Sequence, residues 1–176
     1  MTVRQSRMTI PIPLTFAAIL ALVAISGCGS SGTADDKQAA EWTLEHGGTI
    51  IVSGKFLKID SVEGLPDEPF LIRKIDLNQV DPPITDKDLE QLPVSENLES
   101  LGLHSAQITD KGIEPLLKFS GLKELELSYT KIGDVGLEQL AGLKKLTKLF
   151  LYGILISDEA MEEFKKKRPD CTVYQD

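Results

Sequence analysis

The 176-residue sequence is poor in cysteine, histidine and aromatic residues. Its cysteines are Cys28 and Cys171, and its histidines are His46 and His104. It has no paired zinc ligands, no phosphate-binding glycine loop and no dinucleotide fingerprint. Aromatic residues make up 6% of the chain, so leucine and isoleucine supply most of the apolar content. We therefore expect a core of stacked aliphatic layers, and the sequence indicates no cofactor and no metal.

Acidic residues are missing from the start of the chain. Residues 1–27 contain Arg4 and Arg7 but no Asp or Glu, whereas the whole chain has 27 acidic and 19 basic residues. Without residues 1–27, 17 basic residues (19 minus 2) would remain against 27 acidic ones, a net charge of −10. Such a body repels nucleic acid and anionic lipid surfaces. The one basic run, Lys165 to Arg168, falls at an expected helix C-terminus, where cations favour the helix dipole. We expect no nucleic-acid partner.

Residues 1–27 have the features of a secretory signal peptide. Arg4 and Arg7 precede an apolar stretch over residues 13–24, which is shorter than the ~20 residues of a comfortable membrane span. The segment Ile25-Ser26-Gly27-Cys28 then resembles the lipobox of bacterial lipoproteins. That resemblance implies cleavage before Cys28 and attachment of lipid, palmitate included, to this residue. An uncleaved transmembrane anchor is the alternative.

The lipobox resemblance also implies a location. Two or more acyl chains anchor a protein stably, so the folded part would lie outside the cytoplasm on a lipid tether. Gly29 replaces the aspartate of an inner-membrane retention signal, which favours an outer membrane if the host has one. Residues 28–36 form a flexible tether of mostly small and polar residues. With Cys28 acylated, Cys171 has no partner for an intrachain disulfide, and the fold must depend on packing.

The rest of the chain repeats with a period of 24 residues. Each unit begins with alternating apolar and polar residues, which is typical of a strand with one buried face. Leucines three apart follow and indicate a short helix. The clearest unit contains the apolar residues Leu98, Leu101, Leu103, Ile108, Ile113, Leu116 and Phe119. They recur as Leu122, Leu125, Leu127, Ile132, Leu137, Leu140 and Leu143, and then as Leu146, Leu149, Leu151, Ile156, Met161 and Phe164.

An earlier copy of the unit, over residues 72–92, has two extra residues around Pro82. A polar pair precedes each helix: Thr85-Asp86, Thr109-Asp110, Gly133-Asp134 and Ser157-Asp158. We expect these side chains to cap helix N-termini. The aspartates also invite comparison with a calcium site, but calcium needs six to eight oxygens in one small cage, and successive helix starts lie too far apart for that.

These residues resemble the leucine-rich repeat family, in its 24-residue bacterial form L-x-x-L-x-L-x-x-T-x-I-T-D-x-G-L. The resemblance covers residues 72 to about 174 and implies an α/β, right-handed solenoid. It places a parallel β-sheet on the concave face and helices on the convex face. The position filled by Asn, Cys or Thr in the family is Ala106, Thr130 and Ile154 here, so only Thr130 can bond its turn.

The two ends are expected to cap the solenoid. Residues 37–71 form an N-terminal cap, with a helix around Trp42, a break at Gly47-Gly48, and strands over 49–53 and 56–59. The repeats cover residues 72–168. Residues 169–176 form a C-terminal cap, in which Pro169 ends the last helix and Thr172 to Tyr174 add a strand. We expect Trp42 to pack in the cap rather than to bind a ligand.

The concave sheet face is the candidate site. Outward strand positions form rows across the repeats, and aromatic residues that ought to face solvent are typical interface anchors. The candidate contact residues are His104, Glu126, Tyr129, Phe150 and Tyr152. Alternatively, Phe150 and Tyr152 pack against the C-terminal cap.

We expect a membrane-anchored protein- or peptide-binding module at the bacterial cell envelope. A structural envelope spacer without a single partner is the alternative, and an enzyme is the least favoured class. A nucleophilic pair of Cys171 and His104 is rejected, because the repeats place them several strand spacings of ~4.8 Å apart.

Overall fold

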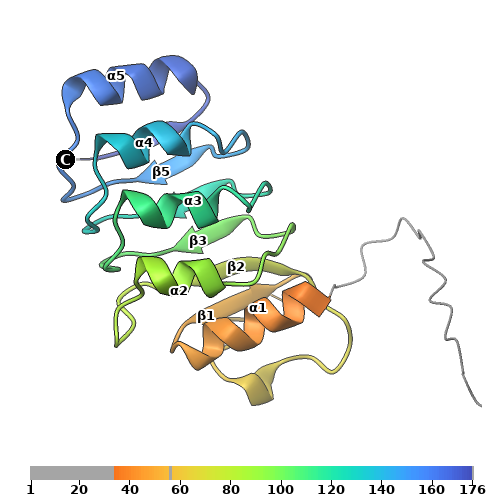
Figure 1. Ribbon diagram of the computed structural model, residues 1–176. Coiled ribbons are helices and arrows are strands. Elements are labelled where there is room, and N and C mark those ends of the chain that lie inside the picture. The colour runs from red at the N-terminus through yellow and green to blue at the C-terminus, as the bar shows by residue number, and fades with distance from the viewer. Residues whose placement is uncertain (1–33, 56, 176) are drawn as a thin grey trace, which may run out of the picture.

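The computed structural model describes residues 34–55 and 57–175. One six-stranded sheet runs through this part of the chain in the order β1-β2-β3-β4-β5-β6. Figure 1 shows α2, α3, α4 and α5 stacked side by side over one face of this sheet. The strands are β1 Thr49–Val52, β2 Ile72–Asp76, β3 Ser100–Gly102, β4 Glu124–Glu126, β5 Lys148–Phe150 and β6 Thr172–Tyr174. The α-helices are α1 Ala34–Glu45, α2 Asp86–Gln91, α3 Ile113–Leu116, α4 Asp134–Leu140 and α5 Asp158–Lys167, with 3-10 turns η1 Val62–Gly64 and η2 Asp110–Gly112.

The sheet register follows the sequence period. Strands β2 to β6 are parallel, and Leu101 pairs with Leu125, Leu125 with Leu149, and Leu149 with Val173. Strand β1 pairs antiparallel with β2, so the predicted N-terminal cap interrupts the parallel order. The expected α/β solenoid of stacked strand–helix units is confirmed.

The core consists of the predicted aliphatic layers. Of the recurring apolar residues, only Ile156 is not fully buried, and it packs against the core as a half-buried side chain. A buried leucine contributes ~1.5–3 kcal/mol relative to an exposed one, so these layers dominate the stability of the fold.

The aspartates before the helices have a different role from the one expected. Asp86 accepts hydrogen bonds from Thr109 N (2.8 Å) and Thr109 Oγ1 (2.7 Å), and Asp134 accepts from Ser157 N (2.9 Å) and Ser157 Oγ (2.8 Å). Each carboxylate therefore bonds the N-cap residue of the following repeat rather than capping its own helix. Hydroxyls cap two of the helical segments, since Thr109 Oγ1 accepts from Lys111 N and Ser157 Oγ accepts from Ala160 N.

Asp110 shows this inter-repeat bond in its strongest form. The N-cap of α4 is Gly133, which has no side chain, and Asp110 Oδ1 accepts from both Gly133 N (2.7 Å) and Gly136 N (3.0 Å). A Cβ at Gly136 would lie 2.6 Å from that oxygen, and a Cβ at Gly112 would lie 2.5 Å from Asp86 Oδ1. The close approach of these two carboxylates thus requires glycine at positions 112 and 136.

The N-terminal cap begins earlier than predicted. Helix α1 starts at Ala34, so the last three residues assigned to the 28–36 tether belong to the fold. Asp36 is fully buried and accepts hydrogen bonds from Ser95 Oγ and from Ile72 N (3.4 Å), which joins α1 to the first repeat. Cys28 and the predicted signal peptide lie outside the described residues. Among the described helices, none is both long enough and apolar enough to cross a membrane.

The rest of the N-terminal cap follows the expected pattern in part. Of the strand predicted over 56–59, Ile59 pairs with Ile50 as an isolated antiparallel bridge, Leu57 is exposed, and Phe56 lies outside the described residues. Trp42 packs against the core and stacks on His46, with 3.9 Å between the ring centroids, as expected of a cap residue.

The C-terminal cap depends on a buried cation. Lys165, Lys166 and Lys167 occupy the last turn of α5, as predicted, but Arg168 turns inward and is 3% exposed. Its guanidinium donates to the carbonyl oxygens of Leu143, Lys144 and Leu146 in the turn before β5. Arg168 is therefore a structural residue.

Candidate functional site: the open face of the sheet

The sheet face opposite the helices, called the open face below, carries the outward side chains of every strand. Strand register aligns them in rows that cross the repeats. The first row is Lys74, Ser100, Glu124, Lys148 and Thr172. The second is Asp76, Gly102, Glu126, Phe150 and Tyr174. The residues just past the strands, Asn78, His104, Ser128 and Tyr152, follow the same period.

Aromatic residues gather toward the last three strands. Phe150 stacks on Tyr174 of β6 with the ring centroids 4.6 Å apart and the ring planes 11° apart. Tyr152 lies two residues beyond Phe150 and is half-buried. The alternative that Phe150 packs against the C-terminal cap is thus correct for one side of its ring. Both rings of the stack remain half-buried and contribute to the open face.

A second aromatic pair lies in the turns that follow β3 and β4. Gln79, Ser105, Tyr129 and Gly153 occupy the same turn position in successive repeats, and all four have positive φ angles between 54° and 66°. This backbone disfavours a tyrosine, yet Tyr129 is there and is 57% exposed. Its ring occupies the space where a Cβ of Gly153 would be, 2.5 Å from Cε1, and meets the His104 ring edge-on at 5.1 Å. The glycine at 153 therefore makes room for Tyr129.

Hydrogen bonds position the aromatic residues of the open face. We call these residues the aromatic strip; they are His104, Tyr129, Phe150, Tyr152 and Tyr174. Asn78 Oδ1 accepts from His104 N (2.8 Å), and Ser128 Oγ accepts from Tyr152 N (3.0 Å). Glu126 Oε1 accepts from Ser128 N (2.8 Å). These bonds fix the backbone that carries the aromatic residues. One carboxylate oxygen of Glu126 therefore already accepts a hydrogen bond in the turn after β4, and Glu126 lies beside its sheet neighbour Phe150.

Charges at the start of the strands are paired. Glu99 Oε1 lies 2.6 Å from Arg73 Nη1 and 3.0 Å from Lys123 Nζ, and Lys148 Nζ lies 3.3 Å from Glu124 Oε2. The hydrogen bond from Lys123 and the charge of Arg73 lower the pKa of Glu99. The aromatic strip itself contains no Lys, Arg, Asp or Glu, which makes it the apolar part of the open face.

The described residues include one cysteine, Cys171, and both histidines, His46 and His104. They contain no group of three or more His, Cys, Asp and Glu residues placed to hold a metal ion. Cys171 is buried, and this burial raises the pKa of its thiol, whereas His104 contacts Tyr129 instead.

The structure brings the predicted candidates together and adds two residues to them. His104 contacts Tyr129, and Glu126 is the sheet neighbour of Phe150. Tyr174 was predicted only as part of the closing strand, although adding 24 to position 150 places it in the same row. Gly153 had no sequence signal as a support for Tyr129, because the contact depends on the direction of a side chain in a left-handed turn.

Comparison with known proteins supports the repeat assignment. Residues 94–117 and 122–141 match the family model described as Leucine Rich repeat. No curated protein matches the chain. Among solved structures, a leucine-rich repeat protein of Leptospira interrogans is 22% identical over 49% of this chain, with a TM-score of 0.33. The aligned part spans 26% of that protein. The match over these two segments and the stacked strand–helix units support a leucine-rich repeat assignment, and the fold is an α/β solenoid.

Proposed function

We propose that this chain is a protein- or peptide-binding module held at the bacterial cell envelope by lipid on Cys28. Leucine-rich repeat domains typically act as protein-binding scaffolds, because stacked repeats create an extended surface. The observation that carries the proposal is the aromatic strip on the open face. Tyrosine and phenylalanine side chains give large contact areas at low entropic cost, and the hydrogen-bonded turns hold them in place before a partner arrives.

Lipid attachment is tested by metabolic labelling. Cells that express the wild-type chain with an alkyne analogue of palmitate should yield a labelled protein in the membrane fraction. Cys28→Ser should lose both the label and the membrane association, because the thiol is the acceptor of the lipid. An equally labelled Cys28→Ser protein, or an unlabelled wild type, would contradict the anchor.

Binding is tested by crosslinking in intact cells followed by mass spectrometry. The test variant is Tyr129→Asn/Tyr152→Ser, in which asparagine tolerates the positive φ of position 129. The matched control, Val135→Ser/Leu155→Ser, removes two exposed apolar side chains that lie outside the open face. We expect the crosslinked partners to be lost from the test variant and retained by the control, with both proteins folded. A partner set that is identical in all three proteins would favour the envelope spacer.

A further inference from the structure

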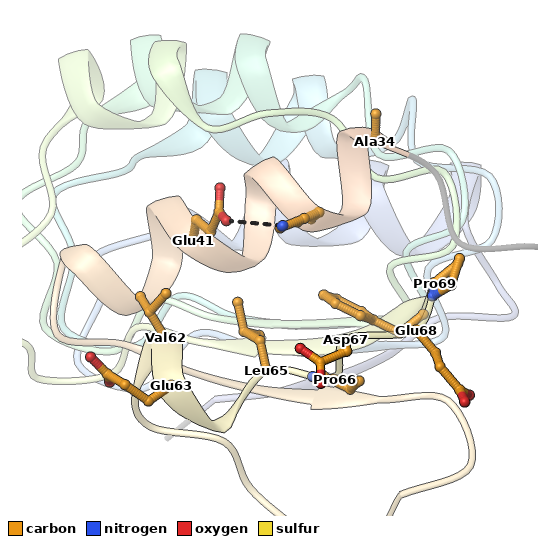
Figure 2. A pocket seen from close by; sticks show the side chains of 11 residues that line it. Ala34, Glu41, Val62, Glu63, Leu65, Pro66, Asp67, Glu68 and Pro69 are labelled. Carbon is orange, nitrogen blue, oxygen red and sulfur yellow. Dashed lines mark ion pairs between the residues drawn. The ribbon is translucent and has the colours of Figure 1, made fainter.

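A cleft with a volume of about 470 Å³ lies away from the open face, between helix α1 and the loop that follows η1. Figure 2 shows Val62 of η1 and Leu65, which directly follows η1, pointing toward α1, with Ala34 and Pro69 near one end. Phe70 is buried beneath the cleft, and Leu65 packs against the core. Pro66 and Pro69 restrict the backbone of the loop, so the cleft is held open by a stiff segment.

The floor of the cleft is apolar and incompletely covered. Val62 is 42% exposed, although its side chain faces α1 rather than bulk solvent. A valine in this position gains further burial only when another group enters the cleft.

The rim of the cleft is acidic, and most of its carboxylates have no cationic partner among the described residues. It carries Glu41, Glu63, Asp67 and Glu68 against a single cation, Lys37. Lys37 Nζ already lies 3.8 Å from Glu41. Glu63, Asp67 and Glu68 have neither an ion pair nor a hydrogen bond to any other described residue, and all three are exposed. By contrast, the acids Glu99, Glu124 and Glu138 on the repeats each have a cationic partner.

The apolar floor and the acidic rim together favour a ligand that has both an apolar part and a positive charge. A lysine or arginine side chain has an aliphatic stem that packs on apolar surface and a charged end that reaches outward. The geometry points to the α1–η1 cleft as a second binding site, which takes a basic segment of a partner protein. Its lysine or arginine stems lie on Val62 and Leu65, and their cationic ends pair with Glu63, Asp67 and Glu68.

The test measures binding of a fluorescein-labelled acetyl-hexalysine amide to the full chain in mild detergent, by fluorescence anisotropy. The cleft variant is Glu63→Gln/Asp67→Asn, and the matched control is Asp81→Asn/Glu162→Gln, which removes the same charges at exposed positions outside the cleft. The cleft variant loses two exposed ion pairs with the peptide, so it should bind about five- to tenfold more weakly. The control should stay within about twofold of the wild type. Val62→Ser should weaken binding as well, because the stem loses its apolar contact.

Two results would overturn the proposal. Equal losses in the cleft variant and the control would show that the peptide senses only the overall negative charge. Sedimentation that reveals a dimer of the chain alone, dissociated by Glu63→Gln/Asp67→Asn, would assign the cleft to a second copy instead. The substitutions replace exposed side chains, and unchanged circular dichroism spectra would show that the variants are folded.

Discussion

The strongest test of the repeat interface is replacement of Asp110 by alanine. Among the residues that the structure describes, its carboxylate is the only side chain that caps α4, because the N-cap residue Gly133 has none. The substitution removes two charge-assisted hydrogen bonds, to Gly133 N and Gly136 N. Loss of a helix cap costs ~0.5–2 kcal/mol, and hydrogen bonds to charged groups contribute ~1.5–3 kcal/mol. We expect Asp110→Ala to lower the free energy of unfolding by about 2–3 kcal/mol. Asp110→Asn, which keeps an acceptor oxygen, should cost about half as much.

Urea unfolding followed by circular dichroism measures these losses, and a second substitution tests their cause. Gly136→Ala places a methyl group 2.6 Å from Asp110 Oδ1, so it should be destabilising in the wild type and much less so beside Asp110→Ala. Gly133 has a negative φ of −134°, so Gly133→Ser can supply a local cap and should restore about 1 kcal/mol in the Asp110→Ala protein. Additive effects of Asp110→Ala and Gly136→Ala, or a loss below about 0.5 kcal/mol for Asp110→Ala, would refute the inter-repeat cap.

Three further predictions concern stability. Arg168→Met should lower the free energy of unfolding in urea by about 3 kcal/mol or more, since it leaves the carbonyls of Leu143, Lys144 and Leu146 without their donor. If Arg168→Met lowers it no more than Lys165→Met does, this role of Arg168 is contradicted. Ser105→Gly should raise the melting temperature slightly, because the φ of 62° costs serine about 1 kcal/mol that glycine avoids, and a lower melting temperature would contradict the prediction. Hydrogen bonds lower the pKa of Asp88, Glu99 and Asp134 in the folded chain. Their stabilisation is therefore complete above the ordinary carboxyl pKa of about 4 and is lost as pH falls through the lowered values, so the urea midpoint should drop below pH 4 and not between pH 8 and 6.

The sequence predicted the layered core because its period is a property of packing. Burial of the large apolar side chains at the inward positions stabilises the fold, so a regular apolar pattern predicts the core. The 24-residue spacing also determines which residues become sheet neighbours, such as Glu126 and Phe150. The hydrogen-bond partners of Asp86, Asp110 and Asp134 could not be predicted in this way. Asp110 is adjacent to its own helix in sequence, and only the stacking of repeats shows that the next helix is closer to its carboxylate.

Local conformation limited the prediction of the site. Tyr129 was nominated as an exposed aromatic residue, and it is exposed, but its positive φ and its position over Gly153 follow from a turn that has glycine in only one of four repeats. The α1–η1 cleft left no periodic signal at all, because its loop belongs to the irregular N-terminal cap. Similarly, nothing in the sequence indicates that Asp36 is buried, because it lies in a run of small and polar residues. The predicted tether over residues 28–36 therefore includes the first three residues of α1.

The positions of the two surfaces relate the two proposals to each other. The cleft is lined by Ala34, and α1 packs on β1 and β2, whereas the aromatic strip runs from the turn after β3 to β6. Strands β1 and β6 are five spacings of ~4.8 Å apart, or roughly 24 Å. A basic segment in the cleft and a separate partner on the aromatic strip would contact different surfaces, so both can bind at the same time. Because the Asp110 bond lies between repeats and touches neither surface, Asp110→Ala should weaken the fold while the folded molecules keep both binding sites.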